Sequence, residues 1–272
     1  MVRGLWTAAS GMTAQQLNVD TIANNLANVN TVGYKRETTN FKSLLYANLG
    51  TTAERNNVQQ PSTSQVGHGV RALANSRNYT SGTLTQTDNP TDLAIQGDGF
   101  FAIDKGDDTV AYTKDGSFRI SMLADEGAYA LVTSDGNTVL STEDESIIIG
   151  TDVPIDKVTI GQDGSVYYMD EDTNTRMDIA QIKMVQFANV QGLEAIGNNY
   201  YVETPNSGVP LVEGEDEGIR RSTIRTGYLE GSNVQVADEM VKLIVAQRAY
   251  ELNSKAIQTV DTMLQQANEL KR

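Results

Sequence analysis

Both ends of the chain carry apolar residues that recur every seven positions. The N-terminal repeat fills one heptad position with Leu5, Met12, Val19 and Leu26, and the position three residues further on with Ala8, Gln15, Ile22 and Val29. The C-terminal repeat fills the matching positions with Val236, Leu243, Tyr250, Ile257 and Leu264, and with Ala246, Asn253, Val260 and Ala267. A helix with such a stripe hides it against another helix. The pattern therefore predicts a long amphipathic helix at each end.

A heptad repeat can also be the buried face of an ordinary globular helix. Here two such helices stand at opposite ends of one chain, with a long stretch of different character between them, which favours pairing with each other and with the ends of neighbouring copies. The residues expected to pack subunits together are Leu5, Met12, Val19, Ile22, Leu26, Val29, Val236, Leu243, Tyr250, Ile257, Val260 and Leu264.

The first helix ends in an unusual run of asparagines, "NNLANVNTVGYK". Asparagine is a mediocre helix former, because its amide competes for nearby backbone groups. A buried amide that finds its partner in only one alignment penalises every slipped register. We therefore expect Asn24, Asn25, Asn28 and Asn253 to set the register of packing, with plain solvent exposure as the open alternative. Gly33 suits a left-handed helix end.

The middle of the chain follows a different pattern. Asp-Gly occurs at residues 98–99, 115–116, 135–136 and 163–164, beside β-rich runs such as "FFAI", "SFRI" and "SVYYM". Asp-Gly tolerates the positive φ angles of tight hairpin turns. The fold class is accordingly α+β, with an antiparallel all-β domain between two pairing, coiled-coil-like helices. We expect an N-terminal helix over 1–33, an extended linker or arm over 34–74, the β domain over 75–222, and a linker and C-terminal helix over 223–272.

Charge and composition exclude several classes of function. Residues 85–217 hold 26 of the 35 acidic side chains and 6 of the 21 Lys and Arg side chains. This strongly acidic segment is expected to repel the phosphates of nucleic acid. The chain has no cysteine, and neither a signal-peptide run nor an apolar span of 18 residues is present. We expect a soluble protein without membrane insertion. If it works outside the cytoplasm, we expect it to leave by a route that does not cleave a standard leader.

The candidate catalytic and ligand motifs are weak. Two Gly-x-Gly-x-x-Ala segments, beginning at Gly67 and Gly97, lack the strand before and the helix after that a dinucleotide site needs. The acidic run from Asp170 has the spacing of a calcium loop at its start, but Thr175 and Gln181 replace the required Gly and Glu. His68 is the sole histidine. We expect no catalytic residues, no cofactor and no metal.

Four long motifs together resemble one family. They are "MVRGLWTAASGMTAQQLNVDTIANNLANVNTVGYKRE", "DLAIQGDGFFAI", "YTKDGSFRI" and "TGYLEGSNVQVADEMVKLIVAQRAYELNSKAIQTVDTMLQQ". They are similar to the rod, hook and hook-basal-body proteins of the bacterial flagellum, and the likeness runs nearly end to end. The short middle is unlike that of hook proteins, and the polar segment over 51–69 with "GYLEGSNV" favours the distal-rod branch. The proximal rod proteins and other hook-basal-body proteins stay open as alternatives.

The resemblance implies an axial building block that self-assembles. In that family the terminal helices pair and pack helically into the inner tube of a hollow drive shaft, and the β domain decorates the outside. The implied partners are further copies of the chain, proximal rod proteins, the hook protein, the flagellar type III export apparatus, and rod-surrounding ring proteins if the envelope has two membranes. The implied location is the basal body, outside the cytoplasmic membrane. Residues 124–178 are more acidic than is typical of the family, so their role is left open.

Overall fold

The computed structural model describes residues 2–48, 65–106, 109–123, 127–150, 153–154, 157–169, 175–214 and 219–270. The chain forms two compact units, and each is assembled from separate parts of the sequence. The helical unit comprises residues 1–27, 37–78 and 235–272, and the β body comprises residues 28–36 and 79–234. The α+β class is confirmed: a helix begins the chain, antiparallel strands fill the middle and a helix ends it.

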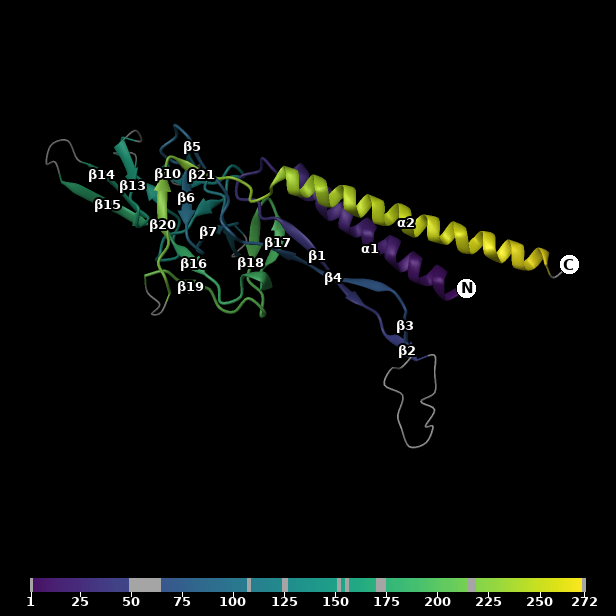
Figure 1. The fold of residues 1–272 in the computed structure, drawn as a ribbon. Helices are drawn as coiled ribbons and strands as arrows, with labels where there is room; N and C mark the ends of the chain where they lie inside the picture. The colour runs from purple at the N-terminus through teal and green to yellow at the C-terminus, as the bar shows by residue number, and fades with distance from the viewer. Residues whose placement is uncertain are drawn as a thin grey trace. The chain divides into compact units, whose positions relative to one another are not determined.

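The helical unit contains two long helices and two short strand pairs. Its elements are α1 (Val2–Ala27), β1 (Glu37–Ser43), β2 (Tyr46–Asn48), β3 (Gln65–Gly67), β4 (Val70–Arg77) and α2 (Val236–Glu269). In Figure 1, α1 and α2 lie side by side, and the start of α1 lies toward the same end of the pair as the end of α2.

Contacts along the two helices fix an antiparallel register. A Cβ added to Gly11 on α1 would lie 2.8 Å from Nδ2 of Asn253 on α2. Nearly four helical turns further along α1, the Asn25 amide donates to the Glu239 carboxylate at 3.2 Å. The residue numbers in both pairs add up to 264. The absence of a side chain at Gly11 therefore lets the helices approach closely at this point.

The described part of the expected linker is an ordered strand pair. β1 pairs antiparallel with β4 over the full length of β1, from Glu37 opposite Arg77 to Ser43 opposite Val70, with a bulge between Asn40 and Phe41. β2 pairs with β3 in the same sense. The described part of the expected linker or arm over 34–74 is therefore extended but paired, so its backbone groups have cross-strand partners. The polar centre of this segment, residues 49–64, lies outside the described residues.

The first helix is also shorter than its repeat suggested. α1 ends at Ala27, and residues 28–33 form turns in which the Thr31 N–H donates to the Asn28 carbonyl at 3.2 Å. The asparagines explain the early end, because their amides favour turns over helix.

The β body is built from antiparallel strands. They are β5 (Leu84–Gln86), β6 (Leu93–Gln96), β7 (Phe100–Asp104), β8 (Val110–Thr113), β9 (Arg119–Met122), β10 (Tyr129–Val132), β11 (Thr138–Val139), β12 (Ile148–Ile149), β13 (Val158–Ile160), β14 (Ser165–Met169), β15 (Arg176–Gln181), β16 (Met184–Gln186), β17 (Glu194–Gly197), β18 (Tyr200–Val202), β19 (Leu211–Val212), β20 (Thr223–Thr226) and β21 (Tyr228–Glu230), with a short 3₁₀ helix at Val190–Gly192. β7 lies inside a ten-stranded sheet, where it pairs with β8, β11 and β16. A separate three-stranded sheet has the order β13-β14-β15.

The strand region extends beyond the expected end at residue 222. β20 pairs with β6, and β21 pairs with β5, so the segment predicted as a linker supplies two strands. The final strands of the body are thus held by partners more than a hundred residues earlier in the chain, and α2 begins only at Val236.

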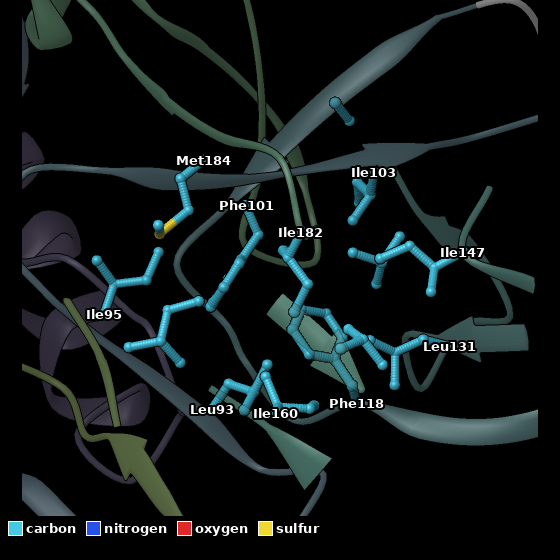
Figure 2. Packing of buried hydrophobic residues seen from close by; sticks show 14 of the residues in the cluster. Leu93, Ile95, Phe101, Ile103, Phe118, Leu131, Ile147, Ile160, Ile182 and Met184 are labelled. Atoms are coloured by element: carbon cyan, nitrogen blue, oxygen red, sulfur yellow. The ribbon is translucent and has the colours of Figure 1, made fainter. Parts of the chain in front are cut away.

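The body has a dense aliphatic and aromatic core. Figure 2 shows side chains from β6, β7, β10 and β16 and from the loops between strands pointing toward one another. Phe101 and Phe118 meet edge to face with ring centroids 5.0 Å apart, and both are fully buried. Burial of a side chain of this size stabilises a fold by about 1.5–3 kcal/mol. The core therefore accounts for the stability of the body without any disulfide.

The four Asp-Gly pairs serve two different purposes. Gly136 and Gly164 have φ of +89° and +83° and stand in the β10–β11 and β13–β14 connections, as expected for hairpin turns. Gly99 and Gly116 do not have positive φ, and there the missing side chain makes room for neighbouring atoms instead. The glycine pattern therefore marks both turns and close contacts.

Candidate assembly surface

The predicted packing residues lie mostly along the contact between α1 and α2. Ile22 is buried, as are the heptad alanines Ala8 and Ala246, whereas Val236 and Tyr250 are 43% and 42% exposed. The remaining positions on the two helices are half-buried: Leu5, Met12, Val19, Leu26, Leu243, Ile257, Val260 and Leu264. Val29 is half-buried too, but it lies beyond the end of α1, in the β body. Their role between subunits stays a prediction.

A second apolar row on α2 escaped the sequence analysis. Its residues are Met240, Val241, Ile244, Val245 and Leu252, each between 51% and 66% exposed. We call this set the apolar row. The heptad count followed one stripe of the helix and passed over residues on the opposite side, which a helical-wheel plot at 3.6 residues per turn would have found. A helix with apolar residues on two sides has more surface to bury than a single partner helix covers.

A groove lies next to the paired helices. It has a volume of about 380 Å³, and its lining includes Gln16 and Val19 from α1 and Gln247, Tyr250 and Glu251 from α2. Val19 and Tyr250 are predicted packing residues, so the groove and the apolar row together form the candidate assembly surface.

The asparagines have different surroundings. Asn25 is 1% exposed and makes three hydrogen bonds within the helical unit: its amide nitrogen donates to the Glu37 carbonyl at 2.7 Å and to Glu239 at 3.2 Å, and its amide oxygen accepts from the Glu37 N–H at 2.9 Å. It thus fixes the start of β1 and the start of α2 to the end of α1. Asn24 is exposed.

The other two polar positions lie at contacts as well. Asn28 is half-buried and its side-chain oxygen accepts a hydrogen bond from the Thr31 hydroxyl at 3.2 Å, while Asn253 faces Gly11. Whether any of these amides sets the register between copies is still a prediction, since the contacts seen are within one chain.

Gly33 is positioned by the β body. Its φ is +69°, its N–H donates to the Glu230 carbonyl at 2.8 Å, and an added Cβ would lie 2.9 Å from the backbone nitrogen of Asp115. The residue therefore needs both the left-handed conformation and the absence of a side chain.

Over the described ranges, no helix is long and apolar enough to cross a membrane, and no group of three or more His, Cys, Asp or Glu side chains is placed to hold a metal ion. The run from Asp170 to Asn174, which has the calcium-loop spacing, lies outside those ranges, as do residues 215–218 of the acidic run near the end of the body.

Three family models match separate parts of the chain. The model described as "Flagella basal body rod protein" matches residues 5–35, "Flagellar hook protein FlgE/F/G D1 domain" matches residues 94–168, and "Flagellar basal body rod FlgEFG protein C-terminal" matches residues 225–270. The matched regions cover α1, the first half of the β body, and the last strands with α2.

Curated relatives match over the whole length. The flagellar basal-body rod protein FlgG of Borreliella burgdorferi is 47% identical over 100% of both chains, and the FlgG of Bacillus subtilis is 38% identical, again over 100% of both. The solved structure of the Helicobacter pylori flagellar hook protein FlgE2 is a distant match, with 15% identity and a TM-score of 0.24 over 62% of this chain and 47% of that one. The chain therefore belongs to the FlgG family of flagellar basal-body rod proteins.

Proposed function

We propose that the chain is a structural subunit, not an enzyme, of the flagellar distal rod. Its terminal helices form a coiled-coil-like core domain that polymerises into the hollow drive shaft carrying torque from motor to hook. The observation that carries this proposal is the apolar row on α2, which stays exposed after α1 has paired with α2. Membership of the FlgG family supports the same conclusion.

The distal rod is favoured over the proximal rod by the relatives. The full-length relatives that carry the name FlgG, at up to 47% identity, support this choice. The partners proposed from the family are further copies of the chain, proximal rod proteins, the hook protein, rod-surrounding rings where two membranes exist, and the type III export apparatus.

The energetics suit repeated modest contacts. Burial of a valine, leucine, isoleucine or methionine side chain contributes about 1.5–3 kcal/mol. Five such residues on each copy, covered by neighbours in a helical lattice, offset the entropy lost on assembly without any strong individual contact. Paired terminal helices with an exposed apolar row thus suit a polymer better than a free monomer.

The experiment replaces two residues of the apolar row one heptad apart. Val245→Asp with Leu252→Asp should leave the folded subunit intact, because both side chains are more than 60% exposed, yet should prevent rod formation and abolish swimming. Each introduced carboxylate would have to lose its water at every repeated contact between copies. The free-energy cost of this desolvation adds to the loss of the stabilisation that apolar burial gave. Circular dichroism of the purified chain and swimming of cells carrying the variant give the two readouts.

The matched control is Gln258→Asp with Gln265→Asp, also exposed, on α2 and seven residues apart. It adds the same charge away from the apolar row and should leave cells motile. Normal swimming with the Val245 and Leu252 changes would contradict the proposal.

A further inference from the structure

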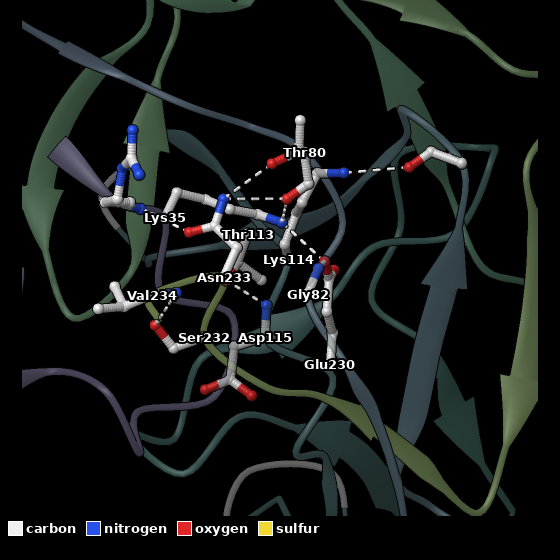
Figure 3. Close-up of polar contacts among 12 residues, drawn as sticks. Lys35, Thr80, Gly82, Thr113, Lys114, Asp115, Glu230, Ser232, Asn233 and Val234 are labelled. Atoms are coloured by element: carbon white, nitrogen blue, oxygen red, sulfur yellow. Dashed lines mark hydrogen bonds and ion pairs between the residues drawn. The ribbon is translucent and has the colours of Figure 1, made fainter. Parts of the chain in front are cut away.

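Three of the motifs that characterise the sequence meet at one buried cluster in the β body. Lys35 comes from "NTVGYK", Lys114 from "YTKDGSF" and Glu230 from "YLEGSN". Each residue is 1% exposed. Figure 3 shows the three side chains among polar groups of β8, β21 and the segments beside them. We call this set the Lys35–Lys114–Glu230 cluster.

Lys35 and Glu230 form an ion pair without contact to solvent. Nζ of Lys35 lies 2.7 Å from Oε1 of Glu230, and both side chains have 0% exposure. Nζ also donates to the Thr80 carbonyl at 3.0 Å, and Oε1 accepts the Gly82 N–H at 2.7 Å. The second carboxylate oxygen, Oε2, is buried and has no hydrogen-bond partner among the described residues. One carboxylate oxygen is thus fully engaged, and the other contributes only charge.

Lys114 brings a second ammonium group into the same region. Its Nζ donates to the Gly97 carbonyl at 3.1 Å and lies 5.0 Å from the centroid of the Phe100 ring. The pKa of Lys114 is lowered to about 8, first by burial and then by the charge of Lys35, while the carboxylates of Glu230, Asp98 and Glu213 act in the opposite direction. Within the described ranges, the cluster therefore holds two lysines and one carboxylate, Glu230, which is in direct contact with Lys35.

The three members come from distant parts of the chain. Lys35 precedes the body's first strand and Lys114 follows β8, whereas Glu230 ends β21, the last strand. β21 is held by its pairing with β5, by the Gly231 N–H donating to Thr83, and by the Gly33 N–H donating to the Glu230 carbonyl. A body without β21 would keep both lysines but would lack the Glu230 carboxylate.

We propose that Glu230 is a charge lock, which makes the β body complete only when the last segment before α2 has docked. Without it, folding would bury two ammonium groups near each other, and an uncompensated buried charge is among the most destabilising changes known in proteins. The β body is therefore stable only when its C-terminal segment, which includes β21, is present and docked. A chain truncated before Glu230 lacks this stabilisation. This inference uses the geometry of the body alone and does not depend on the proposed function.

A simpler role for Glu230 is that of a hydrogen-bond acceptor for Gly82 and Lys35. The two roles differ in their dependence on Lys114. If Glu230 is only an acceptor, its replacement costs the same stability whether or not Lys114 is charged. If it is a charge lock, its replacement costs less stability once the Lys114 ammonium group is removed.

The test uses urea unfolding of the full chain at pH 7 and pH 9.5 for Glu230→Gln, Lys114→Met and the double variant. Glutamine keeps the size and an acceptor oxygen but removes the charge. Glu230→Gln should lower the urea midpoint at pH 7 by about 1 M or more. Lys114→Met should recover at least half of that loss in the double variant, because one of the two buried ammonium groups is gone.

The pH dependence gives a second readout. The pKa of Lys114 in the folded chain, about 8, lies below the ordinary lysine value of 10.5, so the unfolded chain binds more protons between these values and stability rises with pH. Tyr112, with its pKa raised to about 12 by burial, reverses this only above pH 10. At pH 9.5 Lys114 is mostly neutral, so the difference in urea midpoint between Glu230→Gln and the unaltered chain should be smaller than at pH 7. In the Lys114→Met background this difference should not change with pH.

Two outcomes would overturn the charge lock. One is a double variant no more stable than Glu230→Gln. The other, decisive if both variants are too unstable to compare at pH 7, is a Glu230→Gln chain whose deficit at pH 9.5 is as large as at pH 7. Either result would leave Glu230 as a hydrogen-bond acceptor only.

Discussion

Gly116→Ala should unfold the β body or lower its free energy of unfolding by about 3 kcal/mol or more. An added Cβ would lie 1.7 Å from the Leu93 carbonyl oxygen and 2.7 Å from its carbon, both of which are backbone atoms. Relief of this clash would break the hydrogen bond from the Leu93 N–H to the Gly116 carbonyl, which measures 2.9 Å. Rotation of a side chain cannot relieve the clash, because the clashing atoms belong to the backbone. The backbone of Leu93 cannot shift easily either, because its side chain is fully buried in the core. Urea unfolding followed by near-ultraviolet circular dichroism measures the loss.

The matched control is Gly150→Ala. No atom of the described residues lies within 4 Å of a Cβ at Gly150, and its φ is outside the left-handed range. Alanine there should change stability by less than about 1 kcal/mol, with a small gain from the less flexible unfolded chain. Equal midpoints for the Gly116 and Gly150 variants would show that the contact between the Lys114–Ser117 turn and β6 is not as close as described.

Asn25→Leu should destabilise the helical unit by about 2–4 kcal/mol. Leucine is close in size but leaves the N–H and the carbonyl of Glu37 without their amide partners and removes a donor to the buried carboxylate of Glu239. Unsatisfied buried polar groups carry the full cost of desolvation. Thermal unfolding monitored at the helical circular dichroism band is the measurement.

Asn24→Leu is the control, because Asn24 is the neighbouring asparagine and is exposed. It should change the unfolding temperature by only a small amount. If Asn25→Leu also left the unfolding temperature unchanged and affected rod assembly alone, Asn25 would act between copies and its contacts within the chain would be incidental.

The sequence was sufficient for the elements that repeat a local pattern. The spacing from Leu5 to Leu26 and from Val236 to Leu264 predicted both helices, and Asp-Gly pairs such as Asp135-Gly136 predicted hairpin turns. These patterns depend on the geometry of a few consecutive residues, so they can be read without knowledge of partners.

Features that depend on distant partners could not be predicted in the same way. β20 and β21 appeared as a linker because their partners, β6 and β5, lie more than a hundred residues earlier. The sequence did not separate the buried Asn25 from the exposed Asn24, and the partners of Asn25, Glu37 and Glu239, could not be read from local spacing. Gly116 looked like a turn glycine, and only the fold shows that the Leu93 carbonyl occupies the space of a side chain.

The candidate assembly surface was only half visible in the sequence. The heptad stripe was read correctly as apolar, yet most of it lies half-buried or buried within one chain. The apolar row from Met240 to Leu252 stays exposed within one chain, and it does not follow the strict seven-residue spacing. A search restricted to heptads therefore located the helices but missed their most exposed apolar side.

Electron cryo-microscopy of isolated basal bodies tests the central claim most directly, because it shows which surface of each copy touches its neighbours. The account predicts that this chain forms the distal part of the rod, with the α1–α2 pairs lining the inner tube and the apolar row buried against adjacent copies. A rod in which Val245 and Leu252 face solvent, while copies touch only through their β bodies, would contradict it.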